Sequence, residues 1–277
     1  MTSSISVNEQ LTDRQFMRYN RHIMADNIGE AGQLTITKAK VVIIGMGGLG
    51  CPASQYLAAS GVGHITLIDH DVIETSNLQR QVLYTEQDIG KYKVDIARQR
   101  LKSLNPLIDI KAIKHSIFDI NLSELFDSAD IVLDCTDSAE TRHFINAAAV
   151  KSKTQLVSAS AIQGQGQLIS FDFTSHSSPK SPSPSSPSSP SPSSAPSTNP
   201  CYQCLFPAGA TQNLNCSTSG VFSPVLGVLG SLQATEALRL ILGNTNNLNK
   251  LILFDAWGME FKRFTINQDP QCKCCSQ

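Results

Sequence analysis

A glycine-rich stretch, GMGGLG, is the first part of the chain whose residue types suggest a chemistry. Gly45, Gly47, Gly48 and Gly50 form a GxGxxG pattern between an apolar run and a helix-like segment. Glycines let the backbone approach a phosphate, and free N–H groups at a helix start favour an anion. Asp69, at the end of the next apolar run, is placed to bind a ribose hydroxyl. The stretch predicts a nucleotide site, with NAD, FAD, S-adenosylmethionine and ATP all open and a ligand-free tight turn as the alternative.

Cations and amides follow in SNLQRQVLYTEQDIGKYK, which contains Asn77, Gln79, Arg80 and Lys93. Side chains of these types neutralise and orient phosphate oxygens. A dinucleotide oxidoreductase needs no such group here, whereas a site for a triphosphate does. The alternative is a solvated loop followed by an exposed helix face.

The segment DCTDSAETR places Asp134 and Asp137 at the end of another apolar run. Ligands of open α/β sheets bind at the carboxyl ends of the strands. A carboxylate there suits Mg2+ bridged to a phosphate, and Asp137 is the predicted ligand. The alternative is that Asp137 caps the helix that follows.

Two CxxC pairs, Cys201 with Cys204 and Cys272 with Cys275, are typical of a tetrahedral Zn2+ site. They are much farther apart in the chain than in a compact zinc ribbon. Using Cys274 in place of Cys275 would leave one residue between ligands, so we treat Cys274 as a neighbour of the site. The alternative is four unrelated thiols.

Cys216, in the stretch LNCSTSGVFSP, precedes a long apolar segment. A thiol near a helix N-terminus has a lowered pKa and can act as a nucleophile, although an isolated cysteine can equally be inert. We expect Cys51 and Cys135 to be small buried side chains.

Alternating apolar runs and helix-like segments must position these residues. Strand-like runs alternate with helical periodicity from residue 40 to residue 172, which predicts a doubly wound, mostly parallel Rossmann-like sheet. Two helices precede it, and the hairpin KLILFDAWGMEFKRFTI predicts an antiparallel C-terminal extension, closed by the four-cysteine zinc site. The individual expectations are helices over Thr12–Ile23, with a Thr12/Gln15 capping box, Gly29–Lys38, Lys91–Leu104, Glu140–Lys151 and Val221–Leu242, and a strand over Asp109–Ile117.

Residues 175–200 separate two parts of the chain. They contain 13 serines and 8 prolines and no apolar side chain larger than alanine, which predicts a disordered linker. We expect an ATP-binding part over 1–174, this insertion over 175–200, and a partner-binding, zinc-containing part of the same domain over 201–277.

Composition excludes some partners. The formal net charge of -1 leaves no basic excess for nucleic acid or an anionic membrane. The N-terminal residues lack the apolar core of a signal peptide, and we find no run long enough to span a bilayer, so we expect a cytoplasmic protein.

Taken together, the motifs resemble the ThiF/MoeB/HesA family, the adenylating enzymes of ubiquitin-like sulfur carriers. RYNRHI, GMGGLG, LIDHD, SNLQRQ, DIGKYK, DCTD, the split CxxC pairs and NCSTSGV occur in the family's order. Within it the chain is more similar to ThiF of thiamine biosynthesis than to MoeB of molybdopterin synthesis. The resemblance covers almost the whole chain outside the first ten residues and the Ser/Pro segment.

The resemblance implies a reaction. The C-terminal glycine carboxylate of a carrier ending in Gly-Gly, such as ThiS, attacks the α-phosphate of ATP and yields an acyl-adenylate and pyrophosphate. Its implied residue roles are Gly48 at the phosphates, Asp69 at the ribose, Asn77, Arg80 and Lys93 at the triphosphate, and Asp137 at Mg2+. Ser138 stands where the family usually has asparagine, which weakens one expected contact to the nucleotide.

The resemblance also implies partners. Arg21 matches the arginine that reaches into the partner subunit's site, which implies a homodimer with the helix over Val221–Leu242 in its interface. Cys216 matches the cysteine that joins the activated carrier through an acyl disulfide, with sulfur from a persulfide donor such as a cysteine desulfurase. Three other interpretations are the same reaction on the molybdopterin synthase small subunit, an NAD-dependent oxidoreductase, and a non-catalytic zinc scaffold.

Overall fold

The computed structural model describes residues 10–174, 199–209 and 219–276. Most of the predicted Ser/Pro insertion and Cys216 therefore lie outside the described residues. On either side of the insertion, Asn199 Nδ2 donates to the Asp172 carbonyl at 2.7 Å, so the two ends of that segment are held together.

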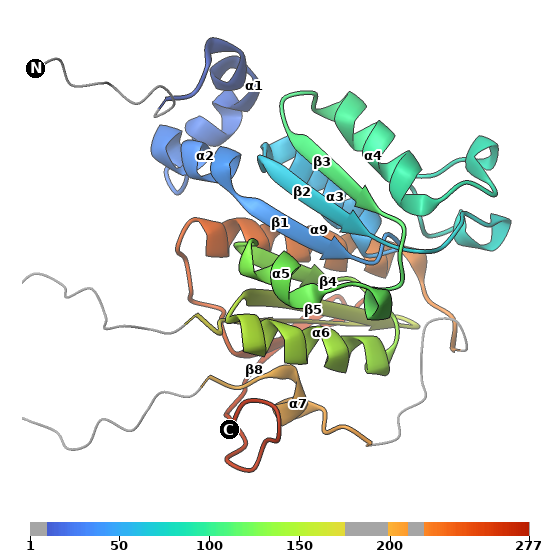
Figure 1. The fold of residues 1–277 in the computed structure, drawn as a ribbon. Helices are drawn as coiled ribbons and strands as arrows, with labels where there is room; N and C mark the ends of the chain where they lie inside the picture. The colour runs from blue at the N-terminus through green and yellow to red at the C-terminus, as the bar shows by residue number, and fades with distance from the viewer. Residues whose placement is uncertain (1–9, 175–198, 210–218, 277) are drawn as a thin grey trace, which may run out of the picture.

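One eight-stranded sheet forms the centre of the molecule, with the order β3-β2-β1-β4-β5-β6-β7-β8 (Figure 1). The strands β3, β2, β1, β4 and β5 are parallel to one another. The other pairs, from β5 to β8, are antiparallel. The bounds are β1 Lys40–Ile44, β2 His64–Ile68, β3 Asp109–Ile113, β4 Ile131–Asp134, β5 Gln155–Ile162, β6 Gln165–Phe171, β7 Lys250–Asp255 and β8 Glu260–Thr265.

Successive residues of a strand point to opposite faces of the sheet. In β1, the side chains on both faces are buried. Val41 and Ile43 belong to one hydrophobic cluster, whereas Val42 and Ile44 belong to a second. A strand with apolar side chains on both faces must be covered on both sides by helices. This is why the sequence of β1 is a continuous apolar run.

Helices cover the two faces in the way that these clusters require (Figure 1). The helices α3, α4 and α9 lie on one face, and α5 and α6 lie on the other. Their bounds are α3 Gly50–Ser60, α4 Lys93–Leu104, α5 Leu122–Asp127, α6 Ala139–Ser152 and α9 Ser223–Ile241. The short helix α7, Tyr202–Leu205, lies next to the C-terminal segment.

Two helices precede the sheet, α1 over Asp13–Ile23 and α2 over Gly29–Lys38. Thr12 caps α1, and Gln15 completes the predicted capping box. The predicted fold class, a mostly parallel doubly wound sheet with N-terminal helices and an antiparallel extension, is confirmed.

One expectation needs correction, and one helix was missed. The strand predicted over Asp109–Ile117 ends at Ile113, because its neighbour β2 ends at Ile68, which pairs with Ile113. The helix α5 was not predicted.

The long apolar helix α9 packs inside the chain. Val225, Leu226, Leu229, Ala237 and Leu240 belong to the hydrophobic cluster on its side of the sheet. Much of its apolar surface is therefore explained by the fold of one chain. No helix in the part of the chain described is long and apolar enough to cross a membrane.

Candidate functional site

The loop between β1 and α3 is built around two glycines that tolerate no side chain. Gly45 has a φ of +93°, and a Cβ added there would lie 2.8 Å from the Cys135 carbonyl oxygen. A Cβ on Gly50 would lie 1.9 Å from the Gly45 carbonyl oxygen. The loop therefore closes tightly onto the start of α3, where helix N–H groups favour an anion.

Asp69 follows β2 and holds the glycine loop. Its Oδ2 accepts a hydrogen bond from the Met46 N–H at 2.7 Å, and its Oδ1 accepts from the Asp71 N–H at 2.8 Å. Burial raises the pKa of the Asp69 carboxyl, and the Lys93 ammonium opposes that shift. The predicted ribose ligand is thus fixed at the edge of the loop.

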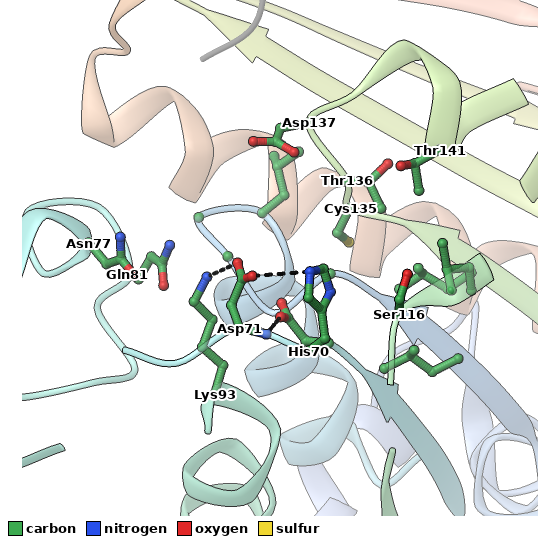
Figure 2. Close-up of a pocket in the computed structure, with 18 of the residues that line it drawn as sticks. His70, Asp71, Asn77, Gln81, Lys93, Ser116, Cys135, Thr136, Asp137 and Thr141 are labelled. Carbon is green, nitrogen blue, oxygen red and sulfur yellow. Dashed lines mark hydrogen bonds and ion pairs between the residues drawn. The ribbon is translucent and has the colours of Figure 1, made fainter. Parts of the chain in front are cut away.

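Lys93 begins α4, and its side chain points to the same edge of the glycine loop as Asp69. Its Nζ lies 2.7 Å from Asp71 Oδ2, and His70 Nε2 lies 3.5 Å from Asp71 Oδ1 (Figure 2). The Lys93 side chain is buried, so its charge is directed into the pocket and balanced by one partly exposed carboxylate.

The segment after β2 also brings amides and a guanidinium to the site. Asn77 ends a short 3₁₀ turn over Thr75–Asn77 and is buried. Arg80 donates from its guanidinium to the Ser76 carbonyl at 2.7 Å. Tyr84 donates from its hydroxyl to the Met46 carbonyl at 2.9 Å, which ties this segment to the glycine loop.

The two aspartates after β4 have different roles. Asp134 is buried and accepts hydrogen bonds from the Thr136 and Ser158 hydroxyls at 2.6 and 2.8 Å, so it supports the turn. Asp137 is exposed at the pocket (Figure 2). Ser138 caps α6 by accepting from the Thr141 N–H at 3.1 Å, so the capping role considered for Asp137 belongs to its neighbour.

One pocket collects most of the predicted site residues at the carboxyl ends of the parallel strands. The predicted residues that line it are Gly45, Gly47, Gly48, Asp69, Asn77, Arg80, Lys93 and Asp137. Donors, a carboxylate and a helix start therefore meet in one cavity, as a phosphorylated ligand requires.

Other predicted residues lie outside this lining. Gly50 packs beneath the loop, and Ser138 caps its helix. Gln79 is exposed and does not line the pocket, and Arg21 is exposed on α1.

Residues that sequence reasoning missed take part in the lining. They include Asp71, Gln81, Thr136 and Arg142. The buried Arg142 donates from its guanidinium to the Thr136 carbonyl and so braces the turn beside Asp137. Asp71 had a visible signal, since it lies two residues after Asp69 in the motif LIDHD.

The four predicted metal ligands come together beside α6. The sulfurs of Cys201, Cys204, Cys272 and Cys275 all lie within 4.8 Å of one another. Cys201 and Cys272 are 3.7 Å apart, and Cys204 and Cys275 are 3.4 Å apart. Tetrahedral zinc with bonds of about 2.3 Å requires sulfurs about 3.8 Å apart, so this donor set fits such an ion.

Cys274 lies beside this cluster. Its sulfur accepts a hydrogen bond from Asn146 Nδ2 at 3.3 Å, and Asn146 Oδ1 accepts from the Tyr202 N–H at 2.9 Å. The residue therefore faces α6, as a neighbour of the four-thiol group.

The remaining described cysteines are buried. Burial raises the pKa of the Cys51 thiol to about 12 and raises that of Cys135 as well. Both thiols are therefore protonated at neutral pH and are poor nucleophiles.

Comparison with known proteins identifies the family of this chain. The ThiF family model matches residues 19–274. The chain belongs to the ThiF family. It is 36% identical over 97% of its length to the molybdopterin-synthase adenylyltransferase of Escherichia coli, covering 99% of that protein. It is 39% identical over 96% of its length to the sulfur carrier protein ThiS adenylyltransferase of the same organism, covering 97% of it.

A solved structure supports the fold of this ThiF family chain. A crystal structure of E. coli MccB with AMPCPP and MccA superposes with a TM-score of 0.72 at 25% identity, covering 98% of this chain and 76% of that one. The predicted family is confirmed, and the expectation of a nucleotidyltransferase is confirmed at the level of the family.

Proposed function

We propose that this chain is an ATP-dependent adenylyltransferase that activates the C-terminal glycine carboxylate of a ubiquitin-like sulfur carrier. The observation that carries the proposal is one pocket in which the glycine loop, Asp69, Arg80, Lys93 and Asp137 meet. The names of the two E. coli relatives supply the reaction class.

The pocket suggests where each part of ATP binds. The phosphates would lie against Gly47 and Gly48 at the start of α3, where free N–H groups attract an anion. Asp69 would accept a hydrogen bond from the ribose. Arg80 and Lys93 would neutralise the charge of the triphosphate.

Adenylation needs positioning and charge neutralisation more than proton transfer. The carrier carboxylate is ionised at neutral pH, so it can attack the α-phosphorus without a general base. The oxygen–phosphorus bond to pyrophosphate breaks as the acyl-adenylate forms, and Arg80 and Lys93 would stabilise the charge on the leaving pyrophosphate. Asp137 would hold Mg2+, which supplies further charge neutralisation at the phosphates.

Arg21 is proposed to act across a dimer interface. It is exposed on α1 and does not line the pocket of its own chain. That position agrees with a guanidinium that binds the triphosphate in the pocket of a second copy of the chain.

Sulfur transfer is assigned to Cys216. Once a sulfur donor, such as a cysteine desulfurase, has converted this thiol to a persulfide, the terminal sulfur would attack the acyl-adenylate carbonyl. AMP leaves, and the carrier is joined to Cys216 as an acyl disulfide. The buried thiols of Cys51 and Cys135 are unsuited to this role.

The preferred carrier is a ThiS-type protein of thiamine biosynthesis, because NCSTSGV around Cys216 matches that branch. The second candidate is the small subunit of molybdopterin synthase, which the 36% identical relative favours. An oxidoreductase explains neither the cations of the pocket nor the thiol cluster, and a non-catalytic zinc scaffold does not explain the pocket.

ATP–pyrophosphate exchange with purified protein tests the proposal. Exchange is expected with a carrier ending in Gly-Gly and should vanish when the terminal glycine is deleted. Parallel assays with the ThiS-type carrier and the molybdopterin synthase subunit decide between the two pathways. Absence of exchange with both carriers, together with NADH binding, would refute the proposal.

A further inference from the structure

Gln81 carries a buried amide whose oxygen has no hydrogen-bond partner among the described residues. The residue is 3% exposed and lines the pocket described above. Oε1 accepts no hydrogen bond from any described residue. Buried polar atoms are nearly always paired, so an orphan atom in a pocket wall indicates a side chain retained for something other than the ligand-free fold.

The backbone around Gln81 is firmly held. Its N–H donates to the Asn77 carbonyl at 3.0 Å, and its carbonyl accepts from the Tyr84 N–H at 3.1 Å. Tyr84 in turn is hydrogen-bonded to Met46 in the glycine loop. The Gln81 amide therefore belongs to a segment whose hydrogen bonds fix its position relative to the glycine loop.

The amino group of this amide faces the glycine loop. A Cβ added to Gly47 would lie 3.6 Å from Gln81 Nε2, so the two groups are neighbours. Among the described residues, Nε2 donates to no acceptor, and in Figure 2 Gln81 lies next to Asn77 on the side of the pocket that also holds Lys93. Within the part of the chain that the structure describes, Nε2 is thus a donor without an acceptor, next to the place where a phosphate would meet the loop.

The two neighbouring cationic side chains already have partners in the ligand-free chain. Arg80 donates to the Ser76 carbonyl, and Lys93 is paired with Asp71. Gln81 adds an uncharged donor to the same pocket, one with no acceptor among the described residues. A neutral amide fixes the orientation of a phosphoryl oxygen by the direction of its hydrogen bond, which a flexible ammonium does less well.

We propose that Gln81 is a phosphate-binding residue, whose Nε2 donates a hydrogen bond to a phosphoryl oxygen of the bound nucleotide. The assignment rests on the proposed function, since that function supplies ATP as the ligand. The sequence suggested that Gln79 supplies an amide to the phosphates. Gln79 is exposed, and we assign this role to Gln81, two positions later.

The role of Gln81 can be separated from a structural one by thermal unfolding. Gln81→Met keeps an unbranched side chain of similar length and removes both polar atoms. Because Oε1 is unpaired, the ligand-free variant should unfold at the same temperature as the wild type or higher. A structural amide would lose stability on the same change.

Nucleotide affinity supplies the second readout. Gln81→Met should weaken ATP binding about tenfold and reduce the ATP-induced rise in unfolding temperature. Gln81→Glu should weaken it more, because a carboxylate of the same shape lacks the donor and repels phosphate. Gln79→Met, two residues away and exposed, is the matched control and should bind ATP like the wild type.

The outcomes are distinguishable. A normal ATP response in the wild type with an unchanged response in Gln81→Met would overturn this assignment alone. ATP binding retained by Gln81→Glu but lost by Gln81→Met would show that the side chain acts as an acceptor, which also overturns it. No ATP response in the wild type would contradict the proposed function and the assignment with it.

Discussion

The Lys93 ammonium lies 2.7 Å from the Asp71 carboxylate, yet the Lys93 side chain is 7% exposed and that of Asp71 is 52% exposed. The cation is inside the pocket, and its counter-charge is at the mouth. A phosphate that entered the pocket would meet an ammonium already desolvated and aimed inward. Asp71 therefore holds Lys93 in place in the ligand-free chain and would compete with a bound nucleotide for its ammonium.

Asp71→Asn tests this competition. The ligand-free variant should be less stable by about 1 kcal/mol, because a nearly buried ammonium loses a half-exposed partner. The rise in unfolding temperature on adding ATP should be larger than in the wild type, since phosphate then supplies the missing counter-charge. Lys93→Met is the control and should show a reduced ATP response. A smaller ATP response in Asp71→Asn than in the wild type would contradict the competition.

Asp137→Asn should reduce ATP–pyrophosphate exchange on the order of a hundredfold and raise the Mg2+ concentration needed for half-maximal exchange. Its unfolding temperature should not change, because the carboxylate is exposed at the pocket. Asp134→Asn is the informative comparison. It should lower stability by about 1–3 kcal/mol, because Asp134 is buried and supports the turn through two hydroxyl donors. An Mg2+ dependence identical to the wild type in Asp137→Asn would remove the metal role.

The glycine loop and Asp69 could be predicted because a strand, a loop and a helix leave periodic signals on both sides of the motif. Gln81 could not. In SNLQRQ, the chain leaves a 3₁₀ turn and runs through further turns, where no fixed period tells which of Gln79 and Gln81 points inward. Asp71 was visible in the motif LIDHD, but its pairing with Lys93 was not, because that ion pair joins residues that are far apart in the sequence.

Strand ends were also harder to predict than strands. The predicted strand included the apolar Ile117, but Lys114, His115 and Ser116 separate it from Ile113, where β3 stops. The edge strand β3 pairs with β2 alone, so its length is set by where β2 ends. By contrast, each CxxC unit was visible, because the spacing of its two cysteines is a local property of the sequence. The pairing of the two units followed from the four ligands that tetrahedral zinc requires.

Cys216→Ser should leave ATP–pyrophosphate exchange at the wild-type rate and abolish the covalent carrier adduct on nonreducing gels. The hydroxyl of serine cannot form the acyl disulfide, whereas adenylation precedes that step. The assay needs the carrier, ATP and a persulfide donor together. Cys51→Ser is a suitable control, because burial raises the pKa of that thiol to about 12 and its adduct yield should match the wild type. An adduct undiminished in Cys216→Ser would assign the reactive sulfur elsewhere.

Cys275→Ser should release most of the bound metal and lower the unfolding temperature, whereas Cys274→Ser should do neither. The sulfur of Cys275 lies 3.4 Å from that of Cys204, within the tetrahedral group, while the sulfur of Cys274 accepts a hydrogen bond from Asn146. Because metal binding couples to folding, a three-thiol site should also lose its metal to a chelator faster. Zinc content after dialysis measures the loss of metal. Unfolding temperature with and without chelator measures the loss of stability. Equal metal loss from the two variants would show that Cys274 is a ligand and that the tail is paired differently.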